Sequence, residues 1–410
     1  MNATSATVLF APSASRQRWL MLGLVWMLYV CFGITTSSIP PLVDPILADL
    51  GISNSQMGMV LGAWPLVFIG TASPMGWLVD RLGVRKALGI GIIVVLASLV
   101  LRGLATNFIT LFLAVGLFGI GGPVISIGAP KMVAQWFGGK ERGLATGIYL
   151  TGPTVGSTFA LATASSVVVP FIGSWRGISV VYGTGVALAA IAWWLFAKEI
   201  PATKQAAIQG RQQANDGDGP RLLSLRNVQL LMVMAMATFF VGHGLNDWIP
   251  TLLKESGMTL VQAGAWTASS TALGALGLLL VPNHVRRGRR TMALGLLLAL
   301  ASATTVGLAL GHGPMLLVSL MMSSTVRSPI TALLTLVLME TPGVGTVRMG
   351  LAGGLLFTAA EVGGFSGPFL QGFLRDATGS LVAGVLALAV VSATLLLLLP
   401  FIKERGQGDG

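Results

Sequence analysis

The sequence predicts an all-α membrane protein with twelve transmembrane helices. Of its 410 residues, 54% are hydrophobic and only 10% are charged, whereas ordinary soluble domains carry about 25% charged residues. The apolar residues gather in segments long enough to cross a bilayer, which takes about 20 helical residues. The 54 glycines agree with a tight helical bundle, because small residues let helices approach each other closely in lipid.

The spanning segments fall into two sets of six. The first set is expected at residues 19–40, 56–79, 86–106, 108–130, 144–168 and 177–197. The second is expected at residues 227–250, 262–282, 291–311, 314–338, 350–373 and 381–402. The polar, breaker-rich stretch between them indicates a solvated linker. We therefore expect an N-terminal bundle over 1–197, a linker over 198–226 and a C-terminal bundle over 227–410.

Lysine and arginine predict the orientation, because they accumulate in cytoplasmic loops. Both termini and the predicted linker share the basic side, while Arg102, Arg176, Lys254 and Arg375 stand alone on the other. Both termini and the linker should therefore be cytoplasmic, in a multi-pass plasma-membrane protein such as one of a bacterial inner membrane. Because the net charge of +11 is spread over short loop clusters, it indicates topology and excludes nucleic acid as a partner.

Enzymatic chemistry is not expected. The single cysteine, Cys31, excludes a disulfide and a cysteine metal site. The histidines His243, His284 and His312 lie in different loops or helix ends, and there is no phosphate-binding loop or nucleophile arrangement. The chain should therefore need no cofactor and no metal.

Two sequence matches indicate an internal duplication. The run Asp80–Lys86 after the second segment corresponds to Val285–Arg290 after the eighth. Likewise Gly143–Gly147 opens the fifth segment and Gly350–Gly354 opens the eleventh. The two offsets are nearly equal, which predicts two pseudo-symmetric six-helix bundles.

The run Gly76–Lys86 resembles the signature loop of the major facilitator superfamily. Together with the twelve-segment plan, the resemblance covers essentially the whole chain. It implies a secondary transporter whose two halves rock about a central site, latched in the outward-facing state by this loop. The residues of the implied latch are Gly76, Asp80, Arg81, Gly83 and Arg85. The alternative interpretation is a basic loop that only sets topology.

Some stretches are similar to particular branches of the superfamily. Arg102, Gly119–Pro123 and Trp248–Pro250 resemble cyanate permease-like carriers, and Trp136–Gly147 is similar to monocarboxylate carriers. Val115 stands where drug/proton antiporters usually carry an arginine. Proton-coupled export of drugs or metabolites is therefore the alternative to import, and a receptor or scaffold is a third class.

Two charged residues lie in the middle of predicted helices, where a charge costs roughly 2.5–3.5 kcal/mol. Arg327 lies in the tenth segment, one of four that line the cavity in this superfamily, and its guanidinium would bind an anion bidentately. Glu361 lies in the eleventh, at the position that matches Thr154 in the first half. With two accessible protonation states, Glu361 is the first candidate for proton coupling. If the two residues paired, substrate and Glu361 would compete for Arg327; the alternative is a fixed structural ion pair.

The other candidate residues are polar side chains near helix ends or in cavity-lining segments. His243, Asn246 and Asp247 lie at the outer end of the seventh segment, where they either serve substrate and protons or simply mark the membrane interface. Tyr29, Thr36 and Ser126 would contact a solute, although such residues more often bond neighbouring backbone. We therefore expect a small, anionic solute transported with protons by a monomer in the lipid bilayer.

Overall fold

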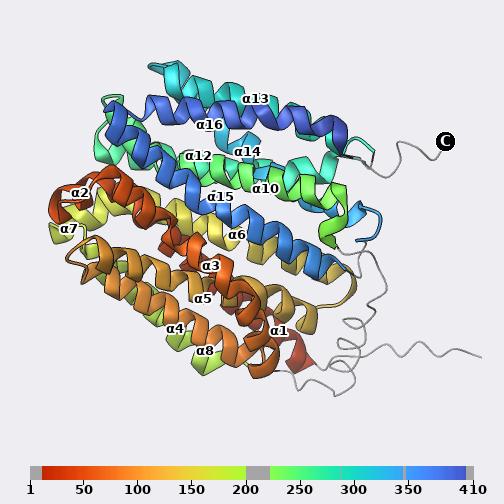
Figure 1. Ribbon diagram of the computed structural model, residues 1–410. Coiled ribbons are helices and arrows are strands. Elements are labelled where there is room, and N and C mark those ends of the chain that lie inside the picture. The colour runs from red at the N-terminus through yellow and green to blue at the C-terminus, as the bar shows by residue number, and fades with distance from the viewer. Residues whose placement is uncertain (1–11, 200–221, 287, 345–347, 403–410) are drawn as a thin grey trace, which may run out of the picture.

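The computed structural model describes residues 12–199, 222–286, 288–344 and 348–402, all of them helical or irregular (Figure 1). The long helices of the first half are α1 (Pro12–Ser37), α3 (Asn54–Leu82), α4 (Val84–Gly103), α5 (Phe108–Trp136), α6 (Gly139–Thr163) and α8 (Gly177–Phe196). Those of the second half are α10 (Arg226–Asn246), α12 (Leu260–His284), α13 (Arg290–Leu310), α14 (Pro314–Glu340), α15 (Met349–Thr378) and α16 (Val382–Thr394). The predicted all-helical fold class is confirmed.

Eleven helical stretches in this part of the chain are long and apolar enough to cross a membrane. The twelfth long helix, α15, has 30 residues and is less apolar because it carries Glu361, Arg375 and Asp376. Most of the expected linker, at residues 200–221, lies outside the described residues. The division into domains at residues 197 and 226 therefore stays a prediction.

Short elements follow three of the long helices, at or just beyond the ends of the predicted segments. After α1 come a 3-10 turn, η1 (Pro40–Leu42), and α2 (Val43–Leu50), and after α10 comes α11 (Ile249–Glu255). α6 continues through a π-helical turn (Ala164–Val168) into α7 (Val169–Ile172). Each of η1, α7 and α11 has a proline in its first turn, where the missing N–H is tolerated and a preceding helix cannot continue unchanged. The last segment ends as a 3-10 stretch (Leu395–Phe401) that includes Pro400.

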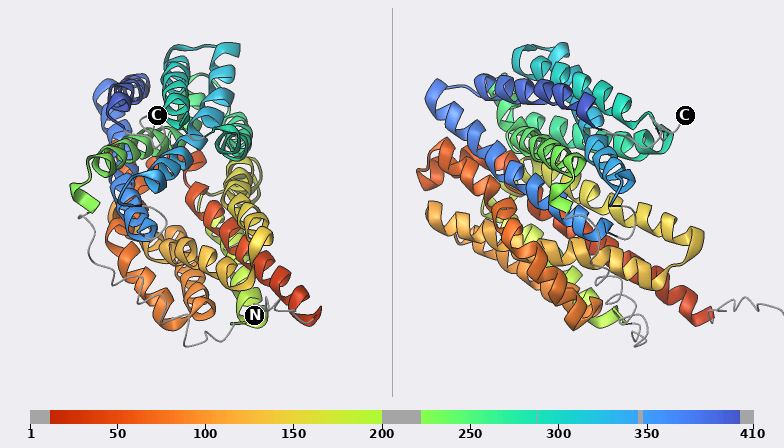
Figure 2. Two further views of the ribbon diagram at one scale, coloured as in Figure 1. Left: turned by 90° about the vertical axis from the view of Figure 1, so that its right-hand side faces the viewer. Right: turned by 45° about the vertical axis from the view of Figure 1, so that its right-hand side comes forward.

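The two bundles form separate groups of helices in Figure 2 and meet mainly along two helix pairs, α3 with α15 and α6 with α12. Glycines permit this approach. A methyl group on Gly62 would lie 2.7 Å from the carbonyl oxygen of Phe365. A methyl group on Gly372 would overlap the carbonyl of Asn54. Close packing of this kind is how helices associate in lipid.

Polar contacts join the two halves at the end of the interface where Gly372 meets Asn54. The predicted orientation places this end outside the cell. Nη1 of Arg375 donates to Oδ1 of Asn54 at 2.8 Å, and the carboxylate of Asp376 accepts from the backbone N–H of Asn54 and Ser55 at 3.0 and 2.7 Å. Nζ of Lys254 donates to Oδ2 of Asp44 at 2.6 Å. We interpret these contacts as an outer closure that joins the two halves.

The opposite ends of the same helices, which the predicted orientation places in the cytoplasm, are more open in the described ranges. Gly147 of α6 and Gly350 and Gly354 of α15 have space around them, because a methyl group added at any of the three would meet no neighbouring heavy atom within 4 Å. The hydrogen bonds and ion pairs that described residues of the two halves form with one another lie at the outer end.

Replacing Gly372 with alanine should loosen the outer closure, because the new methyl group meets backbone of the other half that cannot move aside cheaply. The measurement is labelling of Leu161→Cys, in a Cys31→Ser background, by a membrane-impermeant maleimide added from outside. We expect Gly372→Ala to raise the labelling rate several-fold. Gly354→Ala, on the same helix but in open space, should leave the rate unchanged; equal rates in both variants would contradict the closure.

Candidate functional site

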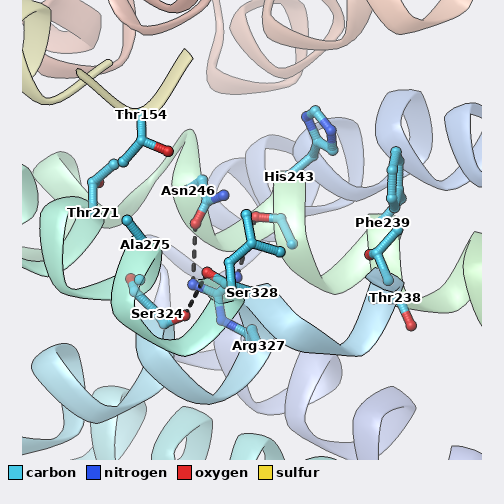
Figure 3. Close-up of a pocket in the computed structure, with 14 residues that line it drawn as sticks. Thr154, Thr238, Phe239, His243, Asn246, Thr271, Ala275, Ser324, Arg327 and Ser328 are labelled. Atoms are coloured by element: carbon cyan, nitrogen blue, oxygen red, sulfur yellow. Dashed lines mark hydrogen bonds between the residues drawn. The ribbon is translucent and has the colours of Figure 1, made fainter. Parts of the chain in front are cut away.

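A cavity of about 240 Å³ lies between the two halves (Figure 3). Helices α10, α12 and α14 of the second half supply most of its lining, and α6 of the first half supplies Thr154. Figure 3 shows Thr154 across the cavity from Arg327. The lining residues are Thr154, Thr238, Phe239, Gly242, His243, Asn246, Thr271, Gly274, Ala275, Leu278, Ser324, Arg327, Ser328 and Thr331.

Arg327 provides the positive charge of this cavity. Its side chain is only 9% exposed. Nε donates to Oγ of Ser323 at 3.0 Å, Nη2 donates to Oδ1 of Asn246 at 3.0 Å, and Nη1 approaches the carbonyl oxygen of Gly242 at 3.5 Å. No carboxylate of the described residues forms an ion pair with it. The charge is therefore met by neutral oxygens alone, and the planar guanidinium remains suited to a carboxylate.

Neutral hydroxyl groups make up most of the remaining polar lining. They belong to Thr154, Thr238, Thr271, Ser324, Ser328 and Thr331. The hydroxyl of Thr238 is buried and has no hydrogen-bond partner in the described part of the protein. The Thr271 and Ser328 hydroxyls already donate to backbone carbonyls and can only accept from a solute, whereas the Thr238 hydroxyl can still donate and accept. The cavity can therefore bind a solute that carries several hydroxyl groups of its own.

Glu361 lies outside this lining, where α3, α10 and α15 meet. It is 4% exposed, and its Oε2 has no hydrogen-bond partner among the residues that the structure describes. Three groups surround Gly364: Oε2 of Glu361, the side chain of Pro65 on α3 and the side chain of His243 on α10. Each would lie within 3.5 Å of a methyl group added to Gly364. Glu361 and Arg327 form no ion pair, so direct competition between substrate and Glu361 for the guanidinium is not the arrangement found.

His243 links the cavity to the first half. Its ring centroid lies 5.5 Å from that of Trp64 on α3 and 5.6 Å from that of Phe239 on α10. The side chain lines the cavity and also approaches Gly364 beside Glu361. It therefore connects the cavity, the carboxyl group and the interface between the halves.

The three residues predicted from the first bundle are not in the lining of this cavity. The hydroxyl of Tyr29 donates to the carbonyl of Ser126 at 3.3 Å, and Tyr29 is 7% exposed. Thr36 donates to the carbonyl of Gly33 at 3.0 Å, and Ser126 donates to that of Gly122 at 3.1 Å. Their hydroxyl groups are engaged with backbone oxygens, as serine and threonine in membrane helices often are.

Several lining hydroxyls were not identified from the sequence. For Thr154 the sequence did contain an indication of its importance, because the internal repeat aligns it with Glu361. Single serines and threonines are common in apolar helices, and nothing in their spacing shows which of them face the cavity. Of the predicted polar residues, the cavity brings together Arg327, His243 and Asn246.

The interactions found for Asp80, Arg81 and Arg85 of the implied latch stay within the first bundle. Nζ of Lys131 donates to Oδ1 of Asp80 at 2.5 Å, and the Arg81 guanidinium lies 5.1 Å from the ring of Trp77. Arg85 donates to the carbonyl of Ala197 at 2.7 Å. Gly83 has φ of +82°, which glycine tolerates best, and Gly76 faces Ile127. Their role as a latch between the halves stays a prediction.

Comparison with known proteins decides the family. The family model "Major Facilitator Superfamily" matches residues 25–368. The chain belongs to this superfamily. It is accordingly a multi-pass membrane protein and a secondary transporter, and not an enzyme.

Individual members of the superfamily are only distantly similar. The chain is 24% identical to the D-galactonate transporter of Escherichia coli O6:H1, over 97% of this chain and 99% of that protein. It is also 24% identical to a quinolone resistance transporter of Acinetobacter baumannii, over 84% of each. Among solved structures, a bacterial homologue of the human lysosomal transporter Spinster superposes with a TM-score of 0.72 at 18% identity, covering 94% of this chain and 95% of that one.

Proposed function

We propose that this transporter imports a small organic anion by alternating access, with Arg327 binding the carboxylate of the substrate. The observation that carries the proposal is the buried guanidinium that lines a cavity between the halves and has no acidic partner in the described chain. Removing a charge from water without a counter-charge is costly. A substrate carboxylate would supply that counter-charge, and two parallel hydrogen bonds from the guanidinium would fix its orientation.

The rest of the lining favours a polyhydroxylated carboxylate. Six serine or threonine hydroxyls surround Arg327, and Phe239 and Leu278 are the two large apolar side chains in the lining. Galactonate, the named substrate of one relative, carries one carboxylate and several hydroxyl groups. The similarity of Trp136–Gly147 to monocarboxylate carriers supports the same charge class.

Coupling to protons is the second part of the proposal, with Glu361 as the carrier. When ionised, Glu361 places an uncompensated negative charge at the junction of α3, α10 and α15, where its Oε2 has no described partner. Protonation removes that charge and favours close packing of the halves. His243 lies between this carboxyl group and the cavity, so it is the residue through which proton binding would reach the substrate site. Asp247 is a second carboxyl near the site, and Asn246 orients Arg327.

We further propose that the protein works as a monomer in a bacterial inner membrane with both termini in the cytoplasm. The distribution of lysine and arginine supports this orientation.

Export of drugs or metabolites is the second candidate function. The similarity to a quinolone resistance transporter favours it. Hydrophobic drugs, however, would find few aromatic or aliphatic contacts in this cavity, and they would not need the Arg327 charge. Retention of drug transport in an Arg327→Gln variant would support export.

Arg327→Lys should weaken anion binding about tenfold to a hundredfold, because lysine keeps the charge but loses the two-pronged hydrogen bond. Arg327→Gln should abolish it. The measurement is the thermal shift of purified protein with D-galactonate, D-gluconate, D-glucuronate and lactate, with neutral galactose as the control. Equal stabilisation of wild type and Arg327→Gln by every anion would remove Arg327 as the binding group.

Glu361→Gln should abolish uphill uptake driven by a pH gradient, because glutamine mimics the permanently protonated carboxyl. Exchange of labelled for unlabelled substrate across proteoliposomes needs no net proton movement and should persist in this variant. Glu361→Asp, which retains a titratable group, should keep part of the uphill uptake. Undiminished pH-driven accumulation by Glu361→Gln would exclude Glu361 as the proton carrier.

A further inference from the structure

A second, smaller cavity of about 100 Å³ adjoins the first and is not used by the anion proposed above. The two cavities share Asn246, Thr271 and Ser324 in their walls. Both halves line the smaller one: Ser37 and Pro40 follow from α1, Ser157 and Leu161 from α6, and the rest from the second half. We call it the outer chamber, because its residues lie toward the closed outer end.

Asp247 is the charged residue of the outer chamber. Its Oδ2 is buried and has no hydrogen-bond partner, and no described lysine, arginine or histidine forms an ion pair with it. Because the residue is partly buried, a positive charge beside its ionised carboxylate would offset the cost of desolvation. No ion pair with a side chain of the described ranges supplies that charge.

Three of the hydroxyl groups that line the chamber with Asp247 already donate hydrogen bonds to backbone carbonyls. Oγ1 of Thr267 donates to the carbonyl of Ala263 at 2.7 Å, and Oγ1 of Thr271 donates to that of Thr267 at 2.9 Å. Oγ of Ser157 donates to the carbonyl of Gly33 at 3.2 Å. Because a hydroxyl has one proton and two lone pairs, these oxygens keep only acceptor capacity. The outer chamber thus offers several oxygen acceptors beside the carboxylate of Asp247.

Two helix ends reach the outer chamber. α1 ends at Ser37 and α10 ends at Asn246, immediately before Asp247, and both residues line the chamber. The C-terminal end of a helix carries partial negative charge and favours a cation. The end of α1 is already met by the buried guanidinium of Arg102, whose Nη1 donates to the carbonyl of Thr35 at 2.6 Å. The end of α10 is therefore the one that a cation in the chamber would stabilise.

We propose that the outer chamber binds a monovalent alkali cation, Na⁺, with Asp247 as the charged ligand and serine and threonine oxygens completing the shell. Hard cations prefer carboxylate, hydroxyl and carbonyl oxygens. One carboxylate balances one positive charge, and the described residues contain no cluster of three or more acidic, histidine or cysteine side chains that would suit a multivalent metal. The proposal rests on the anion transport proposed above. Asn246 lines both cavities, so a cation in the outer chamber and an anion at Arg327 would bind on either side of it, and their charges would cancel.

The test compares NaCl, KCl and choline chloride at constant ionic strength and pH, without any anionic substrate. We expect Na⁺ to raise the melting temperature of purified wild-type protein saturably, K⁺ to act at several-fold higher concentration, and choline not at all. Asp247→Asn should abolish the Na⁺ response. No Na⁺-specific response in the wild type, or a full response in Asp247→Asn, would overturn the proposal.

Two further variants keep the test decisive if Asp247→Asn does not fold. Thr267→Val removes one chamber oxygen at nearly constant shape, and Ser157→Ala removes another; each should raise the half-saturating Na⁺ concentration several-fold. Thr305→Val is the matched control, because Thr305 is also buried, also donates to the carbonyl four residues earlier at 2.7 Å, and lies outside the chamber lining. An unchanged Na⁺ midpoint in both chamber variants would also overturn the proposal.

Arg327→Gln separates this proposal from the anion site. The variant should lose stabilisation by D-galactonate and the other anions of the panel and keep its response to Na⁺. A Na⁺ response without any anion response in the wild type would count against the proposed function and leave the cation site standing. A stability that depends on pH through Asp247 but is indifferent to Na⁺ would assign the chamber to a proton and overturn the Na⁺ site. If both ions bind, each must raise the affinity of the other by the same factor.

Discussion

The guanidinium of Arg327 is held inside an apolar bundle by neutral oxygens. The hydrogen bonds that surround it offset the cost of removing its charge from water. Ser323 precedes it by one helical turn on α14, while Asn246 and Gly242 come from α10. These contacts fix α10 beside α14 and place the serines and threonines of α12 and α14 around the charge. Without them the cost of desolvation would be unopposed, so the same contacts that stabilise the charge also hold it at the cavity wall.

Glycines on α3 and α15 bring the backbones of the two halves into direct contact near that cavity. Gly363 and Gly367 of α15 lie against the backbone of α10 at Met236 and Phe240, while Gly62 of α3 lies against Phe365. One helix is therefore in backbone contact with both halves, and Glu361 is on it. Packed interfaces of this kind exchange between discrete arrangements and do not deform continuously. A change of charge on Glu361 would act directly on the surface that has to separate during transport.

The two adjoining cavities differ in their hydrogen-bonding character although they share part of their walls. The larger one is dominated by the donors of Arg327, and the outer chamber by the acceptors around Asp247. Asn246 stands between them and accepts a hydrogen bond from Arg327. Such a division would let one transporter hold two opposite charges without placing either in direct contact with apolar surroundings.

The sequence by itself determined the helical membrane fold, because about 20 apolar residues per span is a requirement of the bilayer and not of any particular packing. It also singled out Arg327 and Glu361, since charge in a spanning helix is costly wherever the helix lies. Only the tertiary structure decided that these two residues do not pair, that Tyr29, Thr36 and Ser126 bond backbone oxygens outside the lining of the cavity, and that Asp247 faces its own chamber. The physical reason lies in how the helices pack. Close contacts of glycines and prolines between distant segments determine which face of a helix meets which neighbour. When a helix is apolar on nearly every side, its sequence pattern does not indicate which face that is.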